Sequence, residues 1–119
     1  MIRLKLLHSL VKVFPEQEPV GELPDGISLF RNERLHFQLA VYLDRPNLGA
    51  QPLQLAVEGA LAPFVTAERV GLEPCGFPAY DGADSYLVTA PRLAPDVLYP
   101  LEDGCTEIVP GRYESLWLT

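Results

Sequence analysis

Twelve prolines and nine glycines are spread along the 119 residues of this chain. Proline lacks a backbone donor and glycine weakens regular structure, so this punctuation leaves no stretch that could hold several long helices. Hydrophobic residues nevertheless make up 48% of the chain and charged residues 21%, which is the composition of a folded domain. We therefore expect short strands and loops around one core.

Two segments alternate between apolar and polar residues. In residues 35–43 every odd position is apolar, whereas Gln38 and other polar residues fall on the opposite face. This period of two predicts a half-buried strand. Residues 53–57 alternate in the same way, and a loop rich in turn-forming residues, 46–52, connects the two segments. We predict that the two strands are antiparallel neighbours.

Further strands are expected along the rest of the chain. Residues 2–6 alternate and predict a strand, with an amphipathic helix through Leu10 and Val13 as the alternative. The other predicted strands are residues 27–30, 64–70, 86–89, 106–109 and 113–119. Seven or eight short strands predict an all-β, two-sheet antiparallel β-sandwich, Ig-like or jelly-roll-like, that forms a single domain over residues 1–119.

One stretch, residues 73–100, does not follow this spacing. It contains several prolines, three tyrosines and the acidic residues Asp81, Asp84 and Asp96, with 86–89 as its one strand candidate. We interpret it as a long loop, and loops of this length in a compact domain usually serve a function or contact a partner.

The charge of the chain excludes several functions. A net charge of −7 repels a phosphate backbone, no basic run offers an exception, and no apolar window reaches the length of a membrane span. We expect no nucleic-acid or membrane partner.

The apolar start of the chain resembles a signal peptide, but His8, Ser9 and Lys12 interrupt it and no cleavage site follows. We therefore favour a cytoplasmic location. Cys75 and Cys105 are expected as free thiols, because one pair without a secretory context seldom forms a disulfide.

Catalytic and metal-binding patterns are weak. A glycosidase needs two carboxylates, and the candidates lie in Gly- and Pro-rich loops where Asp and Glu ordinarily form turns. These candidates are Asp81, Asp84, Asp96, Glu102 and Asp103. His8 and His36 have no partner at metal-ligand spacing, and neither a nucleophile motif nor a phosphate loop is found. We predict no catalytic residue, metal or cofactor.

Two groups of residues are candidates for contacts. Four aromatic side chains could stack on sugar rings, although capping the core or contacting a neighbouring domain is the favoured interpretation. They are Tyr80, Tyr86, Tyr99 and Trp117. Glu33 and Gln38 are polar residues beside or within an apolar strand, and if buried they should tie a loop backbone to the sheet.

Four segments carry recognisable short motifs: residues 9–15 (SLVKVFP), 31–39 (RNERLHFQL), 94–101 (APDVLYPL) and 109–118 (VPGRYESLWL). Together they resemble the N-terminal β-sandwich domain of proteins similar to glycoside hydrolase family 123. These segments occur in the same order as in that family and span nearly the whole chain. The third segment departs from the family pattern, because Val97 stands where the family often has a second proline directly after Pro-Asp.

The resemblance implies a sandwich followed by a (β/α)₈ barrel that carries the Asp-Glu pair hydrolysing N-acetylgalactosaminides. No residue here matches that pair. Residues 113–119 form a strand-like run with no turn after it, which predicts continuation into another domain. The leading hypothesis is thus a non-catalytic accessory module supporting a downstream barrel. The alternatives are an independent carbohydrate-binding module and a small hydrolase that uses the acidic loop.

Overall fold

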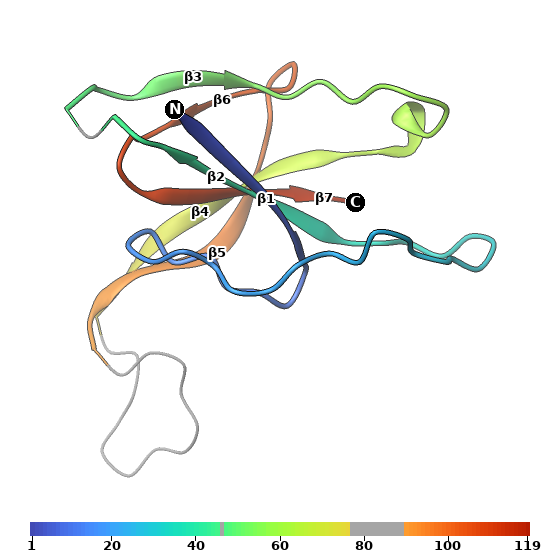
Figure 1. Cartoon of the computed structure of the whole chain (residues 1–119), viewed down its shortest axis with the longest axis horizontal. Coiled ribbons are helices and arrows are strands. Elements are labelled where there is room, and N and C mark those ends of the chain that lie inside the picture. The colour runs from blue at the N-terminus through green and yellow to red at the C-terminus, as the bar shows by residue number, and fades with distance from the viewer. Residues whose placement is uncertain (46, 77–89) are drawn as a thin grey trace, which may run out of the picture.

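The structure, a computed structural model, describes residues 1–45, 47–76 and 90–119. The described residues are all-β and form two antiparallel sheets, as predicted (Figure 1). The larger sheet has the strand order β1-β2-β7-β4-β5 and the smaller one the order β3-β6. The strands are β1 (Ile2–His8), β2 (Phe37–Leu43), β3 (Gln51–Gln54), β4 (Ala67–Cys75), β5 (Arg92–Pro100), β6 (Cys105–Ile108) and β7 (Tyr113–Leu118), and a single 3₁₀ turn, η1 (Ala62–Phe64), precedes β4.

Strands β2, β7 and β4 are the inner strands of the large sheet, because each is paired on both sides. The predicted strands at 2–6, 35–43, 106–109 and 113–119 are confirmed, with ends that differ by one or two residues. The helical alternative for the N-terminus is wrong, since β1 pairs with β2 from Ile2 opposite Leu43 to His8 opposite Phe37.

The predicted pairing between residues 35–43 and 53–57 is also wrong. Strand β2 pairs with β1 and β7, whereas β3 pairs with β6 in the other sheet and ends at Gln54. Alternation identifies the apolar face of a strand, but it carries no information about which strand forms the hydrogen bonds at its edge.

Two other expectations need correction. Residues 27–30 belong to no strand, and the predicted strand 64–70 begins only at Ala67 because η1 occupies its start. Residues 73–75 complete β4, and residues 92–100 form β5 instead of a loop. Strand β5 tolerates Pro95 and Pro100 because it is an edge strand, where a missing N–H can face solvent. The predicted strand 86–89 lies outside the described residues.

Both faces of β2 are covered, so the prediction of a half-buried strand is wrong. One face is directed toward the small sheet, and the segment that follows β1 folds across the other, where Val11 and Val13 pack around Ala40. Ala40 and Val41, on opposite faces, are each 2% exposed. The hydrogen bond from Tyr113 N to Pro15 O, 2.8 Å long, fixes the covering segment to β7.

Gln38 ties this covering segment to the sheet, as predicted for a buried glutamine. Its side chain is almost fully buried, and Nε2 donates to Ser9 O at 3.1 Å and Val11 O at 2.7 Å. Its Oε1 accepts a hydrogen bond of 3.2 Å from Ser115 Oγ on β7. The amide thus satisfies two loop carbonyls and one hydroxyl in the interior.

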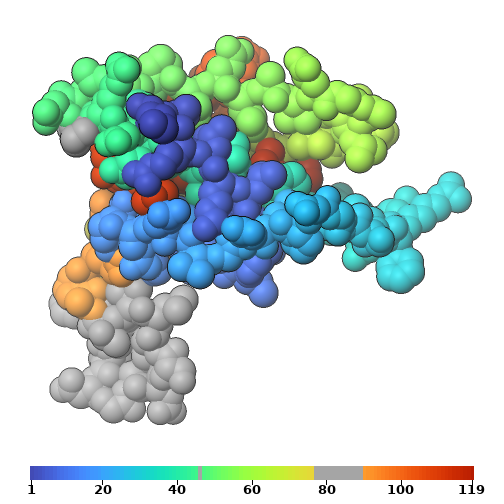
Figure 2. Space-filling view, viewed as in Figure 1, coloured from blue at the N-terminus to red at the C-terminus, as the bar shows by residue number. Residues whose placement is uncertain are grey.

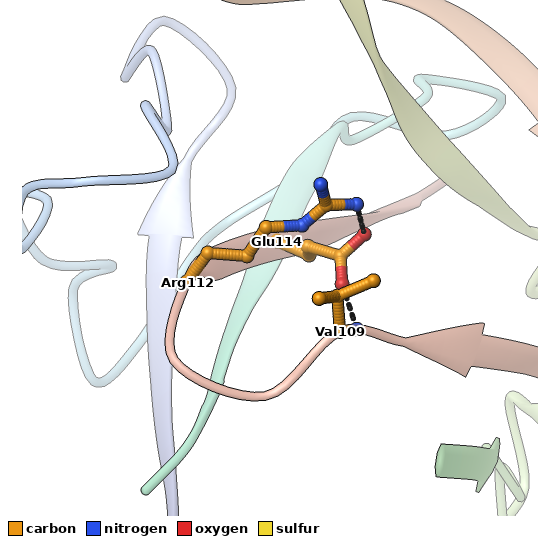
Figure 3. A network of polar contacts seen from close by, with 3 residues as sticks. All are labelled: Val109, Arg112 and Glu114. Carbon is orange, nitrogen blue, oxygen red and sulfur yellow. Dashed lines mark hydrogen bonds and ion pairs between the residues drawn. The ribbon is translucent and has the colours of Figure 1, made fainter. Parts of the chain in front are cut away.

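Glu114 plays a comparable part on the opposite face. Its carboxylate, in a residue only 4% exposed, accepts from Val109 N at 2.6 Å and from Arg112 Nη2 at 3.0 Å (Figure 3). Because both donors lie at the turn between β6 and β7, one carboxylate fixes the connection between the two sheets. Cys75 and Cys105 are free thiols, Cys75 half-buried and Cys105 exposed.

Candidate functional site: an apolar groove at the end of β7

Two segments project from the body of the molecule on either side of the end of β7 (Figure 1). One is the arm, residues 27–36, and the other is the loop of residues 59–66 that contains η1. Figure 2 shows the arm, in cyan, extending well beyond the rest of the surface. Between the arm and the loop lies a groove of about 470 Å³. This apolar groove is lined by Leu29, Glu33, Arg34, Leu35, Phe37, Leu61, Phe64, Val65, Thr66 and Thr119.

The tip of the arm is a tight turn that sequence chemistry explains. Asn32 adopts a left-handed conformation with φ of 68°, which asparagine tolerates better than most residues. Glu33 N donates to Phe30 O at 3.1 Å, and the Glu33 carboxylate accepts from Phe30 N at 2.8 Å. Glu33 is exposed, so it closes a surface turn rather than tying a loop to the sheet as predicted. The turn leaves Phe30 87% exposed.

The loop is anchored at both of its ends. Ala62 N donates to Gly59 O at 3.1 Å, which closes the turn into η1. At the far end, Thr66 and Thr119 exchange two backbone hydrogen bonds of 2.9 and 3.0 Å. Leu61 and Phe64 are left 72% and 78% exposed.

Thr119 joins the arm and the loop at the base of the groove. Its backbone pairs with Thr66, and its Oγ1 lies 2.9 Å from Nδ1 of His36 at the root of the arm. The base of the groove is therefore held by hydrogen bonds, while its walls present apolar side chains. Such a surface is suited to contact with another apolar protein surface, because exposed apolar patches of this kind mark interaction sites.

The sequence reasoning missed the groove. Its prominent members are Leu61 and Phe64, and Phe64 falls within the predicted strand 64–70, whereas the structure leaves both side chains exposed at η1. Apolar residues in a segment punctuated by Gly59 and Pro63 were the available signal.

The structure separates the aromatic candidates that it describes. In the register of the large sheet, Trp117 is opposite Glu68, whereas Tyr99 is opposite Arg69, so the two rings lie on different faces. Trp117 packs against His36 with ring centroids 5.7 Å apart. Tyr80 and Tyr86 lie outside the described residues.

Tyr99 is held by its neighbours. Its hydroxyl donates to Glu73 Oε1 at 2.9 Å, and the Arg69 guanidinium lies 4.9 Å from its ring centroid. The ring also packs so closely against Gly71 that a side chain at Gly71 would overlap it. Tyr99 therefore has an evident structural role at the bulge between β4 and β5.

We expect the pKa of Tyr99 to fall when Glu73 is replaced by glutamine. The hydrogen bond to Glu73, and then the charge of that carboxylate, raise the pKa of Tyr99 above 10.0. An unfolded tyrosine titrates at about pH 10. Because the pKa of Tyr99 is higher in the folded protein, the protonated hydroxyl stabilises the folded state below that pH, and this stabilisation is lost as the pH rises through the folded-state pKa. Titration of the Tyr99 ring carbon by NMR measures the midpoint. A midpoint that is lowered equally by Glu58→Gln, an exposed control in the loop before η1, would contradict this assignment.

The structure does not assemble the candidate carboxylates into one site. Asp96 lies on β5, whereas Glu102 and Asp103 form the tight turn that leads to β6, where Cys105 N donates to Glu102 O at 2.8 Å. Asp81 and Asp84 lie outside the described residues. Within the described ranges, no group of three or more His, Cys, Asp or Glu side chains is arranged to hold a metal ion.

No protein-family model matches the chain, and no curated protein matches it significantly. In the part of the chain that the structure describes, no helix has the length and apolar character needed to cross a membrane.

Proposed function

We propose that this chain is a non-catalytic accessory module that packs through the apolar groove against a downstream glycoside hydrolase-like (β/α)₈ barrel of the same polypeptide. The observation that carries the proposal is the exposure of Leu61, Phe64 and Leu29, which line the groove at the end of β7. The four segments that resemble the sandwich of family 123 support the choice of a barrel as the partner.

The energetics favour a partner in this groove. Burying a large apolar side chain that is otherwise exposed contributes roughly 1.5–3 kcal/mol. Phe64 and Leu61 lie on one wall and Leu29 lies on the other, so one partner element could bury all three. Because Thr119 forms the base of the groove, a segment that continues from β7 would enter between the walls without a long linker.

The first test is the reading frame beyond codon 119. The proposal expects a barrel domain in the same polypeptide. A stop codon at that position, with no barrel encoded nearby, would refute the proposed partner.

The second test compares hydrogen exchange in the 1–119 chain and in the longer polypeptide. We expect residues 27–37 and 59–66 to be protected only in the longer form, because the partner covers them. The double substitution L61E/F64E should remove most of that protection while β1 to β7 remain protected, since both side chains are exposed in the module. The matched control is L10E/V20E, which charges two residues outside the groove that are somewhat more exposed than Leu61 and Phe64. Equal protection of the groove in both forms would contradict the proposal.

A further inference from the structure

A second hollow lies on the face of the large sheet that is opposite the small sheet. It has a volume of about 240 Å³ and is formed between the segment after β1, strand β5 and the indole of Trp117. Trp117 and Gln38 are opposite each other in the β2–β7 register and so share this face. This Trp117 cleft is lined by Ser9, Val11, Lys12, Gln38, Val70, Pro95, Asp96, Leu98 and Trp117.

Gln38 builds one wall of the Trp117 cleft. Its Nε2 donates to the carbonyls of Ser9 and Val11, so the residues that carry the Ser9 hydroxyl and the Lys12 ammonium are held at the rim. The packing of His36 against Trp117 restrains the indole as well. The cleft is therefore preformed, which lowers the entropic cost of binding a ligand.

The lining combines an aromatic ring with polar side chains, two of which are charged. Among residues 1–45, 47–76 and 90–119, neither Lys12 nor Asp96 makes a side-chain hydrogen bond or an ion pair with another residue. Asp96 supplies acceptors, Lys12 supplies donors, and the Ser9 hydroxyl can do both. Because the two charges are opposite, the rim carries no net charge and favours a neutral ligand.

We propose that the Trp117 cleft binds one neutral carbohydrate ring. The apolar face of such a ring would contact the indole, and its hydroxyls would donate to Asp96 and accept from Lys12. Pockets for drug-sized ligands measure roughly 300–1,000 Å³, so a cleft of about 240 Å³ has room for a single ring. This site is independent of the proposed docking function, since the Trp117 cleft and the apolar groove share no lining residue.

Trp117 is the single tryptophan of the chain, so its fluorescence reports directly on the cleft. The 1–119 chain is titrated with the neutral sugars N-acetylgalactosamine, glucose and mannose, with glucuronate and glucosamine as charged analogues and with glycerol as a control for viscosity and refractive index. We expect a saturable change for a neutral sugar, with a dissociation constant on the order of 1 mM, the weak end of the usual affinity scale. The charged analogues and glycerol should give a weaker response or none.

Asp96→Asn should weaken the binding about tenfold, because it removes a charged hydrogen-bond acceptor. The matched control is Asp25→Asn, which makes the same change at an exposed turn outside the cleft and should leave the affinity unchanged. The absence of a saturable response to any neutral sugar, in a chain whose circular dichroism shows it to be folded, would overturn the proposal. Equal weakening by the two substitutions, or tighter binding of a charged analogue, would overturn it as well. None of these results bears on hydrogen exchange at the apolar groove.

Discussion

Replacement of Gln38 by leucine should lower the free energy of unfolding by about 3 kcal/mol, because several buried polar groups would lose their partner together. The amide of Gln38 satisfies the carbonyls of Ser9 and Val11 and the hydroxyl of Ser115, and its residue is 3% exposed. Leucine has a similar volume but offers no hydrogen bond. The covering segment would then detach from the sheet more readily and expose the apolar residues beneath it.

Urea denaturation followed by circular dichroism measures this loss. Gln51 provides a matched control, because its Nε2 also donates to two loop carbonyls, Gly49 O at 3.0 Å and Ala50 O at 3.2 Å, but these bonds are exposed to solvent. Water can replace the amide there, so Gln51→Leu should change the stability by no more than about 0.5 kcal/mol. Equal losses for the two substitutions would show that burial of the Gln38 amide has no special importance.

The structure confirms the alternating strands predicted at residues 2–6 and 35–43. Of the alternating strand predicted at residues 53–57, only residues 53–54 lie in β3, and its predicted pairing is corrected. The pattern of residues 35–43 identified β2 because side chains on a strand point alternately to opposite faces. It could not show that the chain after β1 folds across the even positions, because that contact depends on Val11 and Val13, which precede β2 by more than twenty residues.

Strand β5 shows a different limit of sequence reasoning. Pro95 and Pro100 argued for a loop, since proline is excluded from central strands. Only the sheet order, with β5 at an edge, makes these prolines compatible with a strand. Edge position is a property of the assembled sheet, so it was not available from the local sequence.

The candidate sites were predictable only in part. Trp117 and Tyr99 were selected by residue type, and the one-residue difference in their register neighbours, Glu68 and Arg69, places them on opposite faces. The apolar groove arises where the arm and the loop of residues 59–66 are both bound to Thr119. Contacts between segments so distant along the chain leave no local pattern in the sequence.

Both proposed surfaces depend on the C-terminal end of β7. The apolar groove has Thr119 at its base, and the Trp117 cleft contains the indole two residues earlier in the chain. His36 connects the two positions, because its ring packs against Trp117 and its Nδ1 lies 2.9 Å from Thr119 Oγ1. The rigidity of β7 is therefore important to both functions, and the carboxylate of Glu114 near its start is a direct test of that rigidity.

Replacement of Arg112 by methionine should lower the free energy of unfolding by about 3 kcal/mol, because it leaves a buried carboxylate without its cation. Glu114 would keep only the hydrogen bond from Val109 N (Figure 3). The side chain of Glu114 is 5% exposed, so water reaches it poorly.

The double substitution R112M/E114L should be more stable than R112M alone by about 1 kcal/mol, since an apolar side chain in place of the stranded charge removes the desolvation penalty. The control is Arg92→Met, whose partner Glu16 is largely exposed. That ion pair should contribute no more than about 1 kcal/mol, because water can solvate the carboxylate that remains. Urea denaturation of the four chains gives the comparison. If R112M/E114L proves less stable than R112M, the carboxylate of Glu114 stabilises β7 through Val109 alone, and the ion pair with Arg112 is not what holds the strand in place.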